Sequence, residues 1–237
     1  RGSPRASSIL TGSTEHTPGE EQQRADNNKL MTVDEVQGAW AIMPTPATDN
    51  ANDWRATDTV DLDETARAVN GMVEAGIDGI LSLGTLGECS TLTRAEKRKF
   101  VATAVDAAAG RIPFFTGTTS RGTRETIEQA REAYDLGARG TRLGLRMWCA
   151  ADHKTAVRFF QDVAEACPNM AIAVYCNVAA FRFGFDAAFW AEVSKIPQVI
   201  MSKSGSIHTF EQDLAAVEGR VRLLPIEATY LAAAQAA

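Results

Sequence analysis

The sequence predicts an α/β fold in which strands and helices alternate around a barrel. From residue 38 onward, seven short apolar runs alternate with amphipathic stretches at an even spacing of about 30 to 40 residues, which implies parallel strands with helical crossovers. No Gly-x-Gly-x-x-Gly follows the first run, and polar residues cluster at the C-terminal ends of several runs. These observations favour a (β/α)8 TIM barrel over a doubly wound open sheet, because barrel enzymes place their chemistry at those strand ends.

The first thirty residues are expected to lie outside the barrel. Residues 1–30 are rich in Ser, Thr, Gly, Glu, Gln and Asn and show no periodicity, which is typical of disorder. The chain starts without methionine, so we expect either a fragment or an upstream segment ahead of Met31, a candidate natural start. We therefore divide the chain into a disordered tail at 1–30 and a barrel domain at 31–237.

Seven buried strands are predicted in the barrel domain. Each is a continuous apolar run rather than an alternating one, as expected of strands covered on both faces. The predicted strands are Ala39–Met43, Gly79–Leu83, Pro113–Gly117, Thr141–Leu145, Ala171–Tyr175, Val199–Ser202 and Val221–Ile226.

The helices between these strands carry their own start and stop signals. The run Thr93–Glu96 is a capping box, and Asp61 is expected to cap a helix at 62–75 that ends before Gly76. Two further helices are predicted at 155–166, preceded by Asp152, and at 189–195, capped by Asp186 and ending before Pro197.

The C-terminal end of the barrel is predicted to be incomplete. After the seventh strand the sequence contains only the start of an alanine-rich helix and ends at Ala237. We therefore expect a barrel truncated after about the seventh strand, in which strands one and seven keep open edges. Open edges favour aggregation, so this chain is expected to be poorly soluble or inactive.

Composition and charge argue against several classes of function. Hydrophobic residues make up 45% of the chain and the net charge is −6, so we expect a globular protein with no nucleic-acid or anionic-membrane partner. No apolar run is long enough to span a bilayer or to form a signal peptide. The four cysteines show no metal-ligand spacing, so we expect reduced thiols, a cytoplasmic location and no metal.

Lys203 is the strongest candidate for catalysis. It ends the apolar run Val199–Ser202, where a buried lysine is costly because burial disfavours its charge. A neutral amine at this position can attack a ketone and form a Schiff base. The alternative for Lys203 alone is a strand-end lysine whose ammonium group extends to water.

Tyr175 and Asn177 are expected to lie beside this lysine. Tyr175 ends another apolar strand, 28 residues before Lys203, which is one strand–helix–strand step. Side chains alternate along a strand, so Tyr175 and Asn177 face the same way. A phenol next to a Schiff-base lysine can relay protons, although a tyrosine at the barrel rim can also serve only as a loop partner.

Two further groups are candidates for substrate binding. Gly84, Thr85 and Leu86 lie in the run Gly84–Glu88, where backbone N–H groups and the Thr85 hydroxyl can hold a carboxylate, unless the run is a plain turn. Trp148 follows the fourth strand and can stack on an aromatic substrate or pack under a loop. Weaker candidates at strand ends are Gly117–Thr119 and Glu227. Arg146 and Arg182 are candidate partners for a substrate carboxylate or else solvated rim charges, and Trp190 is expected in the core.

Together these residues resemble the dihydrodipicolinate synthase and N-acetylneuraminate lyase family of Schiff-base barrel enzymes. The resemblance covers about residues 38–227, and the motifs that carry it are Met43–Pro46, Gly84–Glu88, Tyr175–Asn177 and Lys203. Other stretches are most similar to one branch, the trans-o-hydroxybenzylidenepyruvate and 2'-carboxybenzalpyruvate hydratase-aldolases of polycyclic aromatic hydrocarbon catabolism. Those stretches are Gly38–Pro44, Asp53–Thr57, Met147–Trp148 and Phe189–Glu192.

Departures from the synthase pattern favour the same branch. Synthases of the family carry a second threonine where this chain has Leu86, and a tyrosine in the region that holds Trp148 here. They also carry an arginine after the tyrosine motif, where this chain reads Ala179-Ala180-Phe181. One feature is closer to the wider family: Ser204-Gly205 follows the lysine, where the branch has a bulky residue.

The resemblance implies a class I hydratase-aldolase that cleaves an arylidene-pyruvate to an aromatic aldehyde and pyruvate. It implies catalysis by Lys203 and Tyr175, with substrate binding by Gly84, Thr85, Leu86, Asn177 and Trp148. No cofactor is expected, because Lys203 holds the 2-oxo acid covalently, and a homo-oligomer is expected for a full barrel. The alternatives are another pyruvate-dependent lyase or synthase of the family, or an inactive barrel fragment.

Overall fold

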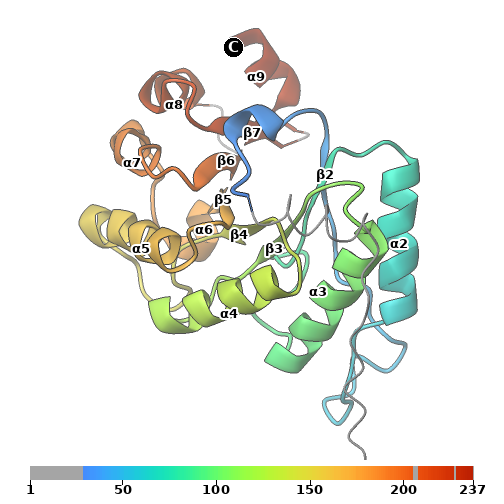
Figure 1. Cartoon of the computed structure of the whole chain (residues 1–237). Helices are drawn as coiled ribbons and strands as arrows, with labels where there is room; N and C mark the ends of the chain where they lie inside the picture. Colours follow the sequence, from blue (N-terminus) through green and yellow to red (C-terminus); the bar gives the residue numbers. More distant parts are fainter. Residues whose placement is uncertain (1–28, 205–207, 227, 237) are drawn as a thin grey trace, which may run out of the picture.

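The strands form a single curled sheet. The computed structural model of the chain describes residues 29–204, 208–226 and 228–236 (Figure 1). Within these residues, seven strands pair in parallel in chain order. The predicted α/β barrel of seven strands is confirmed, and every predicted strand overlaps an observed one. The strands are β1 Trp40–Ile42, β2 Gly79–Leu81, β3 Phe114–Gly117, β4 Gly140–Leu143, β5 Ala171–Cys176, β6 Val199–Ser204 and β7 Arg222–Pro225.

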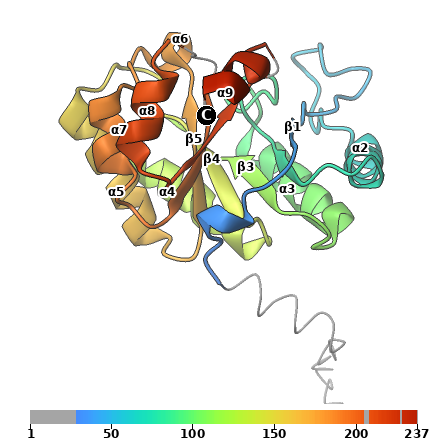
Figure 2. The ribbon, with the colours of Figure 1, turned by 90° about the horizontal axis from the view of Figure 1, so that it is seen from above.

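Helices follow the strands and cover the outside of the sheet, as Figure 1 shows for α2 to α5, α7 and α8, whereas the short α6 lies at the C-terminal end of the strands (Figure 2). A short 3-10 helix precedes β1. The helical elements are η1 Val33–Glu35, α2 Leu62–Glu74, α3 Arg94–Ala108, α4 Thr123–Asp135, α5 His153–Ala166, α6 Val178–Phe181, α7 Ala187–Val193, α8 Phe210–Val217 and α9 Tyr230–Ala236.

The predicted helix caps are present. Asp61, Asp152 and Asp186 each accept a hydrogen bond from the backbone N–H three residues later. The helix after Asp186 begins at Ala187, two residues before the predicted start, because the cap residue directly precedes the first helical residue. The same rule moves the start of α5 to His153, directly after Asp152.

Glu96 connects the capping box of α3 to the segment that follows β1. Its Oε2 accepts hydrogen bonds from the backbone N–H and hydroxyl of Thr93, as the capping box predicts. Its Oε1 accepts two more from the backbone N–H and hydroxyl of Thr59, at 2.8 and 2.6 Å. The hydrogen bonds from Thr59 and then Thr93 lower the pKa of Glu96 to about 2.

The inside of the sheet is filled by a small inner cluster. Leu81, Phe115, Ala173 and Met201 come from four different strands and pack together. Met31 and Val36, on either side of η1, complete the cluster. In Figure 2 the blue segment that carries η1 lies at the opposite end of the strands from α6. The barrel interior is therefore closed at its N-terminal end and carries its polar side chains at the other end.

Two larger clusters lie between the sheet and the helices. The aromatic cluster, under α5, α7 and α8, includes Phe160, Phe183, Phe185, Phe189 and Trp190. The aliphatic cluster, under α2, α3 and α4, consists mainly of Val, Ile and Ala side chains with Phe100 and Phe114. Trp190 is buried in the aromatic cluster, as predicted.

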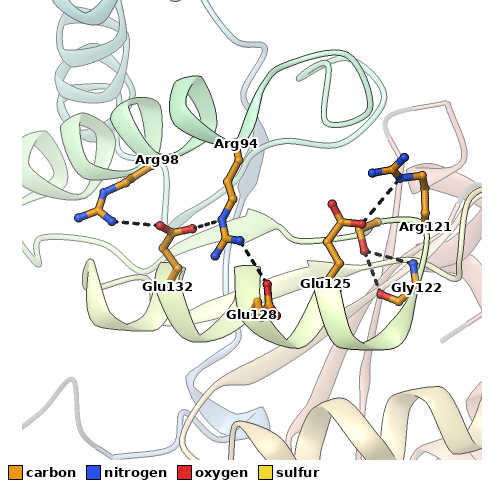
Figure 3. A network of polar contacts seen from close by, with 8 residues as sticks. Arg94, Arg98, Arg121, Gly122, Glu125, Glu128 and Glu132 are labelled. Carbon is orange, nitrogen blue, oxygen red and sulfur yellow. Dashed lines mark hydrogen bonds and ion pairs between the residues drawn. The ribbon is translucent and has the colours of Figure 1, made fainter.

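Ion pairs join α3 to α4 on the outer surface (Figure 3). Glu132 pairs with Arg94 at 3.0 Å and with Arg98 at 3.1 Å, and Arg94 also pairs with Glu128 at 3.2 Å. The arginine side chains are more than half exposed, so water and salt screen these pairs and their contribution to stability is small.

The sheet is open among the described residues, because no pairing joins β1 to β7. The expected insolubility of such a sheet stays a prediction. The predicted disordered tail lies outside the described residues except for its last two positions, and Gly205 and Glu227 also lie outside them. No helix in the described part of the chain is long and apolar enough to cross a membrane.

Candidate active site

Lys203 and Tyr175 face each other at the C-terminal ends of β6 and β5. The two residues are direct partners in the parallel register, as the 28-residue spacing predicts. The Lys203 Nζ lies 5.4 Å from the centroid of the Tyr175 ring. The predicted proximity of the lysine and the phenol is therefore confirmed.

Two polar side chains, those of Thr85 and Asn177, meet at the Tyr175 hydroxyl. The Thr85 Oγ1 lies 2.9 Å from the Tyr175 Oη, and the Asn177 Nδ2 donates to the same phenolic oxygen at 3.1 Å. The Asn177 Nδ2 also lies 3.4 Å from the Thr85 Oγ1, and its Oδ1 accepts from the Ala180 N–H at the start of α6. The structure thus brings together four of the predicted site residues, Lys203, Tyr175, Thr85 and Asn177.

The loop after β2 needs its small residues for close packing. A Cβ on Gly84 would lie 1.6 Å from the Arg142 Nη2, and a Cβ on Gly87 would lie 2.7 Å from the Leu83 backbone nitrogen. Leu83 and Glu88 have positive φ angles of 45° and 55°. The two glycines therefore allow close packing, Gly84 against the Arg142 guanidinium and Gly87 against the Leu83 backbone, while Leu83 and Glu88 take the left-handed positions.

Arg142 is the site residue that the sequence reasoning missed. It lies on β4, is 2% exposed, and holds its guanidinium carbon 4.9 Å from the centroid of the Tyr175 ring. Its Nε and Nη2 have no hydrogen-bond partner within the described residues. The available signal was a charged residue inside the otherwise uncharged run Thr141–Leu145.

The electrostatics of the site favour the anionic form of Tyr175. Burial raises the pKa of the phenol. The hydrogen bonds with Thr85 and Asn177 and the charges of Arg142 and Lys203 lower it by more than burial raises it, so the pKa of Tyr175 lies below its ordinary value. Burial lowers the pKa of Arg142 to about 10, against the opposing effects of Tyr175 and Cys89. Arg142 therefore stays charged at neutral pH.

Tyr175 stands between two pockets. The first, about 390 Å³ in volume, contains Lys203 and extends toward Phe185 and Thr209. The second, about 270 Å³ in volume, contains Thr85 and is also lined by Met147 and Phe181. Both are close to the size range of pockets for small organic ligands. A molecule bound to Lys203 thus has room on both sides of the phenol.

Two predicted binding residues lie away from these pockets. Trp148 is 80% exposed and Leu86 is 72% exposed, and neither lines the two pockets at Tyr175. Arg182, expected as a rim charge, instead donates to the backbone carbonyls of Met147 and Trp148 and so braces the loop after β4. Substrate contacts of Trp148 and Leu86 stay predictions.

The fold and the site together have the arrangement of barrel enzymes, in which side chains from the ends of several different strands form one site. The chain matches the Dihydrodipicolinate synthetase family over residues 50–222, and it belongs to that family. The family resemblance predicted from the motifs is confirmed.

Relatives at 38 to 57% identity are named hydratase-aldolases. The chain is 57% identical over 206 residues to the trans-O-hydroxybenzylidenepyruvate hydratase-aldolase of Sphingobium xenophagum, covering 87% of this chain and 63% of the relative. It is 38% identical over 211 residues to the trans-2'-carboxybenzalpyruvate hydratase-aldolase of Nocardioides sp. (strain KP7), covering 87% and 63%. The chain spans less than two thirds of the length of these relatives.

Solved structures agree with the fold. PhdJ bound to a substrate intermediate superposes with a TM-score of 0.85 at 44% identity, over 87% of this chain and 65% of PhdJ. A dihydrodipicolinate synthase from Cyanidioschyzon merolae, with lysine bound, superposes with a TM-score of 0.77 at 21% identity, over 84% and 67%. The second likeness supports the fold alone.

Proposed function

We propose that this chain carries the active site of a Schiff-base hydratase-aldolase that cleaves an arylidene-pyruvate to an aromatic aldehyde and pyruvate. The observation that carries the proposal is the direct pairing of Lys203 with Tyr175, whose hydroxyl is bonded to Thr85. The identity to hydratase-aldolases supports the choice of reaction. The proposed substrate is a small 2-oxo acid.

Lys203 is the proposed nucleophile. Its neutral amine attacks the ketone of the substrate, and loss of water gives a protonated imine that withdraws electrons from the conjugated alkene. Water then adds to the alkene. Cleavage of the carbon–carbon bond releases the aldehyde and leaves a pyruvate enamine on Lys203, which hydrolysis frees. No metal or organic cofactor takes part in this scheme, because the imine is the electron acceptor.

Tyr175 is the proposed proton carrier. Its phenol lies over the Lys203 amine and between the two pockets, so it can reach both the forming carbinolamine and the hydroxyl that water adds. Thr85 and Asn177 orient this phenol through their hydrogen bonds.

The remaining predicted residues are proposed to bind the rest of the substrate. The backbone N–H groups at Gly84, Thr85 and Leu86 hold the carboxylate next to the lysine, as the loop after β2 lies beside Tyr175. The aryl group lies near Trp148 in this proposal. The complete enzyme is proposed to be a homo-oligomer in the cytoplasm.

Trapping of the imine tests the proposal. The chain is incubated with pyruvate and borohydride, digested, and analysed by peptide mass spectrometry. We expect a reduced pyruvyl adduct on the Lys203 peptide and none on the peptide of Lys195, an exposed lysine at the end of α7. A folded sample with no adduct at Lys203 would contradict the proposal and favour an inactive fragment.

The aldehyde identifies the substrate class. With the trapped site established, the reverse reaction is run with pyruvate and either an aromatic aldehyde or aspartate semialdehyde. We expect condensation with the aromatic aldehyde. Condensation with the semialdehyde alone would assign a different pyruvate-dependent synthase reaction to the same site.

A further inference from the structure

Arg142 is a buried cation without a carboxylate partner. It is 2% exposed, and the groups that favour its charge are the Tyr175 phenol and the Cys89 thiol, with no Asp or Glu paired to it among the described residues. Two of its nitrogens, Nε and Nη2, have no hydrogen-bond partner there. A buried charge without a partner is strongly unfavourable, so its presence calls for an anion nearby.

The surrounding backbone makes room for this guanidinium. In the sheet, Arg142 is level with Gly117 on β3 and Ala173 on β5. Gly84 leaves the space for the guanidinium, because a Cβ there would lie 1.6 Å from the Arg142 Nη2. The absence of a side chain at Gly84 thus lets the guanidinium lie against the Tyr175 ring.

Cys89 does not supply the missing anion. Its Sγ lies 3.5 Å from the Thr119 carbonyl oxygen and 3.8 Å from that of Gly117, and it donates its proton toward them. Burial raises the pKa of this thiol, so it stays protonated at neutral pH. Among the residues that the structure describes, Tyr175 is the remaining acidic group that acts on Arg142.

We infer that Arg142 is a positioning residue for Tyr175. The Arg142 guanidinium provides the counter-charge that lets the phenolic oxygen of Tyr175 accept a proton during the reaction. The inference rests on the proposed function and specifies how its proton carrier works. In the cleavage step the Tyr175 oxygen takes the proton of the substrate hydroxyl. The electron pair of the broken O–H bond forms the aldehyde carbonyl, and that of the broken carbon–carbon bond moves to the imine, giving the enamine.

The other charged and hydrogen-bonding groups around the phenol act in the same direction. Lys203 approaches it from β6 as a second cation whenever its amine is protonated, and Thr85 and Asn177 contribute hydrogen bonds. Once Lys203 forms the imine and the substrate brings its carboxylate, Arg142 remains as a fixed charge on β4. Because Arg142 lies inside a strand rather than on a loop, the backbone of β4 fixes where its guanidinium lies relative to the Tyr175 ring.

Direct titration of the phenol tests the inference without any turnover. The chain has three tyrosines, so replacing Tyr134 and Tyr230 with phenylalanine leaves Tyr175 as the sole source of tyrosinate absorbance. In this background we expect the near-ultraviolet titration of Tyr175 to fall at lower pH than that of an ordinary tyrosine. Arg142→Met moves the titration to higher pH, whereas the control Arg146→Met, an arginine in the loop after β4, leaves it unchanged.

Kinetics and stability separate this role from a structural one. At neutral pH we expect Arg142→Met to lower kcat by about tenfold or more, with recovery as the pH rises. Its thermal midpoint should not fall, because an unpaired buried charge replaced by an apolar side chain is often neutral or stabilising. Lower activity that tracks lower stability at every pH contradicts the inference.

The remaining outcomes are also decisive. If Tyr175 in the parent background titrates at or above the ordinary pH of a tyrosine, the inference is wrong, and this result does not depend on folding of the Arg142 variant. A higher KM for 2-oxo acid with an unchanged titration would assign Arg142 to the substrate carboxylate instead. Failure of the borohydride adduct with a shifted titration would reject the proposed reaction and keep the Arg142–Tyr175 pair.

Discussion

The two sides of this open barrel differ in how they are built. Under α5, α7 and α8, the Phe189 ring contacts Phe160, Phe183, Phe185 and Trp190 edge to face, with centroids 5.3 to 5.7 Å apart. Under α2, α3 and α4, the corresponding aromatic contact is a single pair, Phe100 with Phe114 at 6.4 Å. The aromatic side is held by directional ring contacts, and the aliphatic side mainly by small apolar side chains.

The difference matches the two tasks of the site. The aromatic side carries β5 and β6, which are six residues long and bring Tyr175 and Lys203 into register. The aliphatic side carries β2, three residues long, and the irregular loop with Thr85. Groups that react must keep a fixed geometry, whereas a binding loop needs exposed backbone N–H groups. The side with the longer strands therefore carries the groups that we propose react, and the side with the short β2 carries the proposed binding loop.

The largest expected effect is at the lysine. Lys203→Ala should lower turnover at least about a thousandfold, because no other group forms the imine. The matched control is Lys195→Ala, which removes an exposed lysine just after α7. Near-normal turnover in Lys203→Ala would show that the aromatic side does not carry the chemistry.

The comparison of the two cores is sharpened by two phenylalanines that are both fully buried, Phe189 and Phe100. Each change to alanine should cost about 3 to 5 kcal/mol in the free energy of unfolding. Phe189→Ala should cost more by about 1 to 2 kcal/mol, because it loses several ring pairs rather than one. Chemical denaturation of both variants measures the difference, and equal costs would contradict the distinction between the two cores.

A smaller effect is expected at the polar anchor of the aliphatic side. Glu96→Gln should destabilise the chain by about 2 kcal/mol at neutral pH, since the carboxylate accepts four hydrogen bonds that favour its charged form. Its pKa is lowered to about 2 in the folded state, so this stabilisation is complete above about pH 4.5 and is lost as the pH falls toward 2.

Thermal unfolding as a function of pH checks the Glu96 prediction. The gap between the parent and Glu96→Gln should close at acid pH. The control Glu74→Gln, at the exposed end of α2, should show no gap at any pH. A pH-independent gap at Glu96 would mean that shape rather than charge explains its contribution.

The smallest expected effect is on the surface of the same side. Glu132→Gln breaks the pairs with Arg94 and Arg98 and should cost less than about 1 kcal/mol, because both arginines are largely exposed. Raising the salt concentration should remove most of that difference. A larger, salt-independent loss would show that the α3–α4 network stabilises the aliphatic side more than its packing does.

The sequence by itself determined the order of the elements and the central pair of the site. Continuous apolar runs and Asp or Thr caps are local signals, so the strands, the helix starts and the 28-residue step from Tyr175 to Lys203 were predictable. The Gly84–Glu88 motif likewise placed Thr85 at a strand end. Such features depend on residues that are near in the chain.

Only the tertiary structure decided which residues surround the phenol and which do not. Arg142 reaches Tyr175 because Gly84 leaves space on another segment, and a sequence does not show which small residue will face a given long side chain. Trp148, predicted beside the substrate, lies exposed because the loop after β4 turns its side chain outward while Met147 points into the pocket. Long-range packing sets these side-chain directions, and local pattern does not encode it.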